Sequence, residues 1–336
     1  MTPKDRLVKA IKLEKLDRPP ITCFNQTVTL EQMENVGVFW PEAHKKADKM
    51  ALLAAQVWEQ NKLEGIGVPF CQTVEPEILG CNIKWELDKK ESIPATFHKG
   101  FESVDDIDIP ENFTEKGRMA VVLDAIEILD KKYGDTVPVM GRINGPLSLS
   151  AALAEVVKLL KFVMKDPDKV IEFNELSLEI LKEYGNAMYD RGACLVCVED
   201  MVASPDIIGN KFYGRFALPH NSALIKGLNG LTALHICGNT EFVIEKMAET
   251  GTDIISIDSK ANLTNILAKL KGKVAVAGNV DTISSLMHGT IDDVNKDVKR
   301  CIEEGVDIVT PGCAIPPLTL NTNVRAMVDA TVNHPK

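Results

Sequence analysis

Short apolar runs alternate with longer amphipathic segments along the whole chain. The runs end at glycine, proline or polar residues, which is typical of buried strands. They predict eight strands, at residues 21–24, 65–69, 137–141, 194–198, 231–237, 252–257, 273–277 and 307–310. The segments between them carry apolar residues at helical spacing. They predict helices at residues 4–13, 41–62, 118–132, 147–155, 156–164, 167–188 and 321–332.

Strands that alternate with helices predict an α/β fold of the TIM (β/α)8 barrel type, with residues 1–336 forming one domain. We expect the helix at residues 4–13 to be an N-terminal extension. Residues 71–113 break the alternation, because glycine, tryptophan and prolines interrupt short extended pieces. This segment predicts a β-hairpin insertion at the rim or lid of the barrel mouth. An open doubly wound sheet is the alternative, but polar residues follow nearly every strand instead of gathering at one switch point.

In a barrel of this type, the carboxyl ends of all strands meet at one face, which is the catalytic face. We therefore expect the polar residues after the strands to surround a single cavity. These residues are Asn25, Arg142, Asn144, Glu199, Asp200, His235, Cys237, Asp258, Asn279, Asp281 and Cys313.

His235 and Cys237 lie two residues apart at the end of a predicted strand, so their side chains point to the same face. Imidazole and thiolate are ligands that Zn²⁺ prefers. Cys313 follows another predicted strand in a Pro-Gly-Cys turn and offers a third ligand. Three protein ligands and one open position are typical of a catalytic zinc site. The competing interpretation is that these are ordinary buried core residues.

The remaining residues at the predicted mouth are candidates for catalysis or substrate binding. Arg142 suits an anionic group, although it would equally suit a carboxylate of the barrel mouth. Asp258 and Asp281 are candidates to fix the tautomer of His235, but Asp281 is also well placed to cap the helix that follows it. Glu199 either polarises the site or caps the next segment.

Composition and charge exclude several classes of function. The formal net charge is −10, whereas a nucleic-acid-binding protein needs a basic surface. The N-terminus has no apolar signal segment, and no apolar run is long enough to span a membrane. We therefore expect a cytoplasmic protein whose cysteines are thiols or ligands. Cys194 and Cys197 are three apart on a predicted strand, so they face opposite ways and are expected to be two separate buried thiols.

Several stretches resemble the uroporphyrinogen decarboxylase fold family, and the resemblance covers essentially the whole chain. They are Asp17-Arg18-Pro19-Pro20, Gly145-Pro146-Leu147-Ser148-Leu149, Gly278-Asn279-Val280-Asp281 and the C-terminal part from Gly305 through Met327. Within this family, His235, Cys237 and Cys313 resemble the ligand set of the zinc-dependent methylcobamide:coenzyme M methyltransferases of methanogenic archaea, above all the methanol-specific type.

The resemblance implies a reaction, a cofactor and a partner. A methyl group would pass from methyl-Co(III) on a corrinoid protein to the thiol of coenzyme M (2-mercaptoethanesulfonate), in methanogenesis from methanol. A thiolate is the reactive nucleophile, and coordination to one catalytic Zn²⁺ would deprotonate the thiol. Water or Glu199 would fill the open zinc position at rest, and Arg142 is the candidate for the sulfonate.

Three alternative functions are also compatible with the sequence. One is a methylamine-specific paralogue of the same reaction. Another is a metal-free enzyme like uroporphyrinogen decarboxylase, which would not depend on Cys313. The last is a non-catalytic module in which zinc stabilises a surface that binds a corrinoid protein, which predicts a fourth protein ligand.

Overall fold

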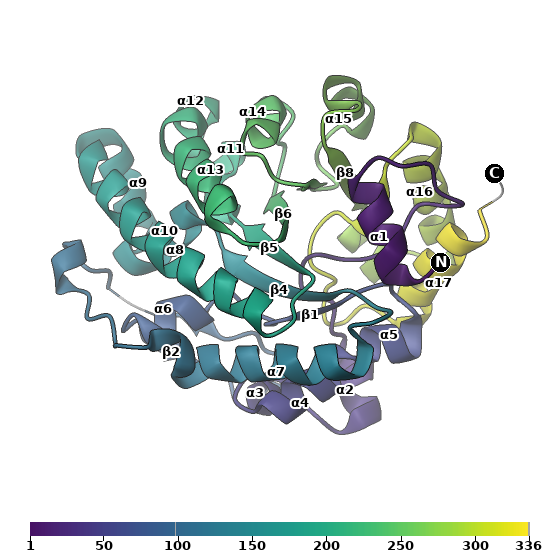
Figure 1. The fold of residues 1–336 in the computed structure, drawn as a ribbon, viewed down its shortest axis with the longest axis horizontal. Helices are drawn as coiled ribbons and strands as arrows, with labels where there is room; N and C mark the ends of the chain where they lie inside the picture. Colours follow the sequence, from purple (N-terminus) through teal and green to yellow (C-terminus); the bar gives the residue numbers. More distant parts are fainter. Residues whose placement is uncertain (98, 335–336) are drawn as a thin grey trace.

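A curled parallel sheet forms the centre of the molecule (Figure 1). The computed structural model describes residues 1–97 and 99–334; residue 98 of the predicted insertion and residues 335–336 of the predicted domain lie outside the described residues. Seven strands pair in the order β1-β4-β5-β6-β7-β8-β9. Their bounds are β1 (Ile66–Val68), β4 (Val139–Asn144), β5 (Leu195–Glu199), β6 (Leu231–Ile236), β7 (Ile254–Ile257), β8 (Ala275–Val280) and β9 (Ile308–Pro311).

The segment at residues 21–24 closes this sheet into a barrel. Ile21 forms a single parallel bridge with Val309 of β9, and its carbonyl accepts a hydrogen bond from Glu64 N, just before β1. The predicted barrel is therefore confirmed, and the open sheet is excluded. The first predicted strand is reduced to one bridge, because the N–H of Ile21 donates to the carboxylate of Glu64 and not to a neighbouring strand.

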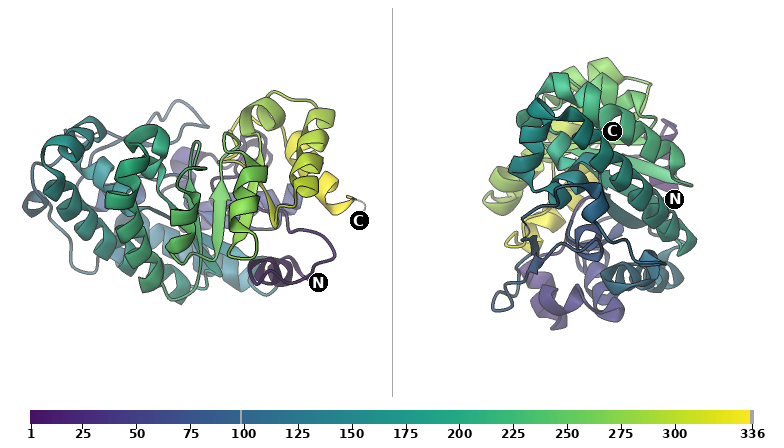
Figure 2. Two further views of the ribbon diagram at one scale, coloured as in Figure 1. Left: turned by 90° about the horizontal axis from the view of Figure 1, so that it is seen from above. Right: turned by 90° about the vertical axis from the view of Figure 1, so that its left-hand side faces the viewer.

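Helices surround the barrel (Figures 1 and 2). They are α1 (Pro3–Ile11), α2 (Leu30–Val36), α3 (Trp40–Ala43), α4 (Ala47–Ala54), α5 (Gln56–Asn61), α6 (Val74–Ile78), α7 (Gly117–Tyr133), α8 (Pro146–Ala154), α9 (Val156–Lys165), α10 (Pro167–Asp190), α11 (Pro205–Ile208), α12 (Asn210–Phe212), α13 (Leu218–Gly227), α14 (Ile244–Glu249), α15 (Leu263–Leu270), α16 (Ile291–Glu304) and α17 (Asn321–Val332). Short 3₁₀ or π turns are η1 (Val104–Asp106), η2 (Phe113–Glu115), η3 (Met201–Ala203), η4 (Tyr213–Ala217) and η5 (Thr282–Met287).

Two features of the first 62 residues differ from the prediction. The predicted long helix at residues 41–62 is divided into α3, α4 and α5. The first break places the fully buried ring of His44 among Trp40, Phe70 and Trp85. Helix α2 was not predicted, although Thr29 and Gln32 form a capping box at its start.

Helix α1 closes the end of the barrel opposite the strands' carboxyl ends. Its Leu7 and Ala10 join the small hydrophobic cluster inside the barrel, together with Leu195, Ile254 and Ile308. A much larger cluster fills the space between the sheet and the surrounding helices. The barrel interior is thus packed at its lower end, which leaves the carboxyl end of the strands for a cavity.

The predicted insertion contains a short antiparallel hairpin, β2 (Ile83–Lys84) and β3 (Ala95–Thr96), which follows α6. The end of the insertion is bonded to the α8–α9 corner, because Phe101 N donates to Leu153 O and Lys158 Nζ donates to Phe101 O. In both figures the hairpin and α9 lie at the end of the molecule away from the two termini. No helix in the described part of the chain is long and apolar enough to cross a membrane.

Candidate active site at the mouth of the barrel

His235, Cys237 and Cys313 come together at the carboxyl ends of β6 and β9. His235 Nε2 lies 3.3 Å from Cys237 Sγ, and Cys237 Sγ lies 3.6 Å from Cys313 Sγ. All three potential ligand atoms are within 4.8 Å of one another, and among the described residues they form the one such group of potential metal ligands. The two sulfur atoms are free thiols, since a disulfide bond would be about 2.05 Å long.

The three groups are coupled by shared protons. A hydrogen bond from Cys237 lowers the pKa of Cys313 to about 4, although burial opposes this shift. The same hydrogen bond, assisted by burial, raises the pKa of Cys237 far above its ordinary value. Burial lowers the pKa of His235, but the hydrogen bond to Cys313 and the charge of its thiolate more than offset this and leave the pKa raised. The three groups therefore share their protons, and the hydrogen bonds to Cys313 favour its thiolate form.

Ser256 orients the imidazole of His235. Its Oγ lies 3.1 Å from His235 Nδ1, and the two residues are paired in the register of β6 and β7. This contact leaves Nε2 directed at the sulfur atoms. The predicted partners Asp258 and Asp281 do not fill this role, because their carboxylates accept backbone N–H groups elsewhere.

A cavity of about 400 Å³ opens beside Cys313. Five predicted site residues line it, namely Asn25, Arg142, Asn144, Glu199 and Cys313. Its outer wall is mostly apolar and is built from the hairpin, α8, the start of α9 and the segment after β5, with Ile93, Pro94, Ala151, Ala152, Val156 and Val202. The cavity thus joins a polar floor, next to the thiols, to an apolar entrance.

Glu199 is fixed on the floor of the cavity by two amide groups. Asn25 Nδ2 donates to its Oε1 at 2.7 Å, and Gln72 Nε2 donates to its Oε2 at 2.7 Å. The carboxylate is nearly buried, with 7% of the residue exposed. The side chain of Glu199 thus lines the cavity and does not belong to the group of three side chains that could hold a metal.

Asn144 holds a second buried carboxyl group. Its backbone N–H and its Nδ2 donate to the two carboxyl oxygens of Glu75, at 2.9 and 3.0 Å, and Nδ2 also donates to Gln72 O. Burial raises the pKa of Glu75 to about 7, although the hydrogen bonds from Asn144 lower it. Asn144 therefore connects the Gln72–Glu199 pair to a group that titrates near neutral pH.

Arg142 is held by main-chain carbonyls and not by a carboxylate. Its Nε donates to Phe24 O, and its Nη1 donates to Gly67 O and Pro69 O. Its Nη2 has no partner among the described residues. Burial lowers the pKa of this guanidinium. The side chain is thus a fixed positive charge beside the cavity, with one donor nitrogen left over.

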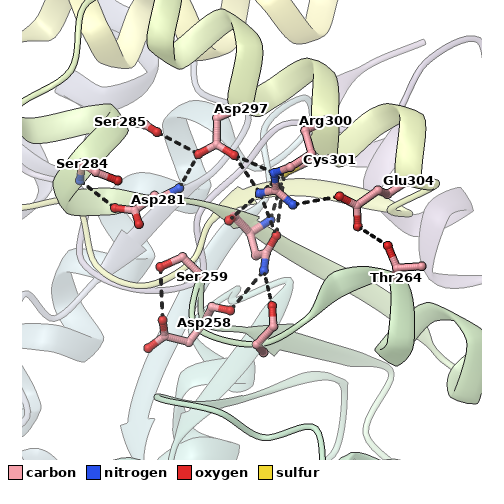
Figure 3. A network of polar contacts seen from close by, with 12 residues as sticks. Asp258, Ser259, Thr264, Asp281, Ser284, Ser285, Asp297, Arg300, Cys301 and Glu304 are labelled. Atoms are coloured by element: carbon pink, nitrogen blue, oxygen red, sulfur yellow. Dashed lines mark hydrogen bonds and ion pairs between the residues drawn. The ribbon is translucent and has the colours of Figure 1, made fainter.

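Asn279 and Asp281 lie outside the cavity, contrary to the expectation that all strand-end residues surround it. The Nδ2 of Asn279 donates to Asp258 O and Ala261 O, and its Oδ1 accepts from Arg300. Asp281 accepts from the N–H groups of Ile283 and Ser284, so it caps η5, as the helix-capping alternative for this residue predicts (Figure 3).

Asp200 and Asp258 also have structural partners. Asp200 is fully buried and accepts from Ser148 and Asn221. Asp258 Oδ2 accepts from Gly238 N at 2.8 Å, next to Cys237. Asp258 thus contacts the backbone next to Cys237 and not the imidazole of His235.

The sequence interpretation missed three residues of the site, namely Gln72, Glu75 and Ser256. Gln72 follows β1. It could have been found by considering polar residues a few positions beyond Pro69, and not only those directly after the predicted strand. Glu75 lies in a Val-Glu-Pro-Glu segment that looks like a solvated turn. Ser256 is recognisable only once the register of β6 and β7 is known.

The three donor atoms fit a zinc ion. Two sulfur atoms bound at about 2.3 Å to a tetrahedral ion lie about 3.8 Å apart, and the observed separation is 3.6 Å. The donor set of two thiols and one imidazole is that of a soft or borderline metal. Fold and site together define a (β/α)8 barrel with a thiol-rich group that could hold a metal at the carboxyl ends of its strands.

Comparison with known proteins agrees with this description. A match to the family described as "Uroporphyrinogen decarboxylase (URO-D)" covers residues 2–334. The chain is 35% identical to the methylcobamide:CoM methyltransferase MtbA of Methanosarcina mazei, over 99% of this chain and 98% of that protein. It is 32% identical to the methylcobamide:CoM methyltransferase MtaA of Methanosarcina barkeri, over 98% and 97% of the two chains.

Solved structures show the same fold. A structure described as "methyltransferase from Methanosarcina mazei" superimposes with a TM-score of 0.94 at 32% identity and covers 99% of this chain and 98% of its own. A B12-independent methionine synthase from a Shewanella species shares the fold at 14% identity, with a TM-score of 0.62 over 94% and 97% of the two chains. The chain belongs to the uroporphyrinogen decarboxylase family and, within it, to the methylcobamide:CoM methyltransferases.

Proposed function

We propose that this protein moves a methyl group from a methylcobamide, carried by a partner corrinoid protein, to the thiol of coenzyme M. The observation that carries the proposal is the convergence of His235, Cys237 and Cys313 within 4.8 Å beside a cavity large enough for a small thiol. The end-to-end similarity to methylcobamide:CoM methyltransferases supports the choice of donor and acceptor.

His235, Cys237 and Cys313 would hold one Zn²⁺ ion. When bound, the ion supplies a Lewis acid that lowers the pKa of a substrate thiol and keeps its sulfur nucleophilic. The chain contributes two soft ligands, and the hydrogen bond that Cys237 donates lowers the pKa of Cys313 and so favours its thiolate form. Ser256 keeps the imidazole in the tautomer whose Nε2 has a lone pair for the metal.

We assign to Glu199 the role of accepting the proton that the substrate thiol loses. Its Oε1 and Oε2 each accept one amide hydrogen bond, which leaves further lone pairs on both oxygens. Asn25 and Gln72 hold the carboxylate in place, and Asn144 holds Gln72 through its carbonyl. These three amides are positioning residues in the proposal.

Arg142 is the proposed partner of the sulfonate. The residue is one of those that line the cavity, and its Nη2 is a buried donor left without a partner after Nε and Nη1 make three bonds to main-chain carbonyls. A guanidinium N–H forms a strong charge-assisted bond to an oxyanion. Asn279, Asp258 and Asp281 are not given a substrate-binding role, because their side chains are bonded outside the cavity.

We further propose that residues 71–113 form the rim of a single-domain barrel, where the corrinoid protein docks. Leu87 and Phe97 of this rim are 63% and 73% exposed, and Met164 on the adjacent α9 is 70% exposed. A corrinoid ring is far too large for a cavity of about 400 Å³ and must approach with its carrier from outside. Leu87→Ser and Phe97→Ser should slow transfer from the protein-bound corrinoid and leave transfer from free methylcobalamin unchanged. If the substitutions change the rates with both donors equally, the docking role is refuted.

For the source of the methyl group we propose methanol, and the alternative is a methylamine. The resemblance of the sequence motifs supports methanol, while the similar identities of 35% and 32% to MtbA and MtaA do not separate the two relatives. Offering the purified protein corrinoid carriers methylated from methanol or from methylamines would decide between them. A higher kcat/KM with the methylamine carrier would reverse the assignment.

The central experiment measures zinc content and coenzyme M-dependent demethylation of free methylcobalamin, before and after removal of the metal by a chelator. One zinc per chain, with activity that is lost on chelation and restored by zinc, is the expected result. Bound zinc without thiol methylation would favour the non-catalytic binding module. Decarboxylation of a porphyrinogen in metal-free protein would favour the decarboxylase alternative.

A further inference from the structure

The barrel sheet alone does not explain why the two cysteines are so close. Cys237 follows β6 and Cys313 follows β9, and β7 and β8 lie between these strands. With neighbouring strands about 4.8 Å apart, the two strands are separated by roughly 14 Å along the sheet. The sulfur atoms nevertheless lie 3.6 Å apart. Curvature of the barrel brings inward-pointing side chains together, and the turn after β7, which lies between the two cysteine loops, contacts both of them.

The turn after β7 contacts the loop of the first cysteine. Asp258 Oδ2 accepts the N–H of Gly238 at 2.8 Å, and Oδ1 accepts the N–H of Lys260 at 3.0 Å. Gly238 directly follows Cys237 and has φ +84°, a conformation that favours glycine. The carboxylate of Asp258 thus fixes the backbone of Gly238, the residue directly after Cys237.

The same turn contacts the loop of the second cysteine. A Cβ atom on Gly312 would lie 2.4 Å from Ser259 N and 3.1 Å from Ser259 Cα, so the backbone of Gly312 packs directly on that of Ser259. Gly312 N also donates to Val280 O at 2.8 Å, which holds this loop to the end of β8. Asp258 and Ser259 therefore form a spacer that touches the residue after Cys237 and the residue before Cys313.

Contacts from outside the barrel hold the spacer in place. Asn279 Nδ2 donates to Asp258 O at 3.1 Å, while Arg300 Nη2 donates to Asn279 Oδ1 at 3.1 Å. Arg300 lies on α16 and is itself held by Asp297 at 2.7 Å and by Glu304 at 3.3 Å (Figure 3). Its side chain is 40% exposed, so the chain of contacts runs from the protein surface to the metal-binding loops.

We propose that the Asp258–Ser259 turn is the spacer that sets the separation of Cys237 and Cys313 for one metal ion, and that Arg300 positions this turn through Asn279. The proposal rests on the metal-binding role assigned above to His235, Cys237 and Cys313. Asp258 and Arg300 are positioning residues, because neither belongs to the ligand group. Removing either should loosen the ligand geometry without removing a ligand.

The test measures metal binding, not turnover. Purified metal-free Asp258→Ala, Asp258→Asn and Arg300→Met are titrated with Zn²⁺ against a chromophoric chelator and with Co²⁺, whose thiolate charge-transfer absorption reports how many sulfur atoms are bound. Loss of a group that holds a metal ligand in position, without binding the metal itself, costs about 10- to 100-fold in metal affinity. This is the loss that we expect for Asp258→Ala. A smaller loss is expected for Asp258→Asn, because the amide oxygen still accepts from Gly238 N, and for Arg300→Met.

Arg325→Met is the matched control. Arg325 lies on α17, is 45% exposed and pairs with Asp329 four residues along its helix, so it loses a similar surface ion pair with no contact to Asn279. This control should bind metal like the wild type. Unchanged Zn²⁺ affinity and Co²⁺ absorption in folded Asp258→Ala would overturn the proposal. If that variant does not fold, equal affinities of Arg300→Met and Arg325→Met would overturn it.

The outcome separates this inference from the proposed function. A wild-type protein that binds zinc but does not methylate coenzyme M would refute the methyltransferase role and leave the spacer intact. A wild-type protein that is active, with variants that bind metal normally, would refute the spacer alone.

Discussion

The two sides of the barrel mouth satisfy their polar groups in opposite ways. On the side of β6 and β9, two thiols and an imidazole face one another at 3.3 to 3.6 Å, and no amide or guanidinium side chain is bonded to their sulfur atoms among the described residues. On the side of β4 and β5, Glu199 and Glu75 are each bonded by donors from Asn25, Gln72 or Asn144. The first side leaves its donor atoms available for a ligand. On the second side amides hold both carboxylates in a rigid wall, beside which Arg142 Nη2 has no partner among the described residues.

This contrast explains which variants should abolish the chemistry and which should only alter it. If the two thiols and the imidazole hold a metal as proposed, no other groups of the chain can replace these soft donors. A wall made of mutually bonded amides and carboxylates can lose one member and keep its shape in part. The predictions below separate the two sides, in order of decreasing expected effect on activity.

Cys313→Ala should remove both metal binding and methyl transfer. We expect zinc affinity and the rate with coenzyme M to fall more than about 100-fold. Removing a ligand should lower the metal affinity more than removing a residue that only holds a ligand in position. Metal analysis and the methylcobalamin assay check both. Cys194→Ala, at a half-buried thiol outside the ligand group, is the control and should retain both properties. A zinc-bound, active Cys313→Ala protein would contradict the distinction between the two sides.

Glu199→Gln should keep the metal and lose rate. If Glu199 accepts the thiol proton, kcat should fall at least about tenfold at pH 7, with zinc content unchanged. The defect should shrink as the pH rises, because more of the thiol ionises in solution. A pH profile of kcat, measured beside the wild type, tests this. An unchanged kcat at pH 7 would leave Glu199 as part of the wall only.

Arg142→Lys should change the preference between thiols. Lysine cannot reproduce the fixed guanidinium geometry, so KM for coenzyme M should rise about tenfold, the equivalent of one charge-assisted hydrogen bond. KM for 2-mercaptoethanol, which has no sulfonate, should stay the same and serves as the internal control. Equal changes for both thiols would show that Arg142 only supports the backbone carbonyls around it.

Glu75→Gln should have the smallest effect on activity and a clear effect on stability. The pKa of Glu75 is raised to about 7 in the folded protein, so the folded state holds an extra proton between pH 4.5 and 7. Its contribution to stability is full below pH 4.5 and is lost as the pH rises through 7, by about 3 kcal/mol. Denaturant unfolding at several pH values should show a flatter pH dependence for Glu75→Gln than for the wild type.

The exposed carboxyl of Glu111 provides the control for this measurement. Glu111→Gln should unfold with the same pH dependence as the wild type. If Glu75→Gln also keeps the wild-type dependence of unfolding free energy on pH, Glu75 is ionised in the folded protein. Its hydrogen bonds then offset the cost of burying the charged carboxylate.

The barrel and its metal-binding group were predictable because both follow from local rules. The spacing of His235 and Cys237 puts both side chains on one face of a strand, and strand ends of a barrel meet at one side. The hairpin insertion was visible because its prolines and glycines break the pattern. Helix α17 was predicted with its observed bounds.

What the sequence left open depends on three-dimensional packing. Asn279 follows Ala275 and Ala277 at strand spacing and should point inward, but it bonds the carbonyls of the loop after β7 and the guanidinium of Arg300. His44 divides the predicted long helix because its ring packs among aromatic residues far along the chain. Such contacts join segments that are far apart in the sequence, so the local periodicity of hydrophobic residues cannot predict them.

The packed lower end of the barrel, where Leu7 and Ala10 of α1 join the interior cluster, has a consequence for the order of events. The cavity opens at the mouth, and the docked corrinoid protein would cover that opening. On the proposed function, coenzyme M would then have to enter before the carrier arrives, and the methylated thiol could leave only after the carrier departs. The two substrates would bind in a compulsory order. Excess carrier protein would then inhibit the reaction, because it would bind the free enzyme and block the access of coenzyme M to the cavity.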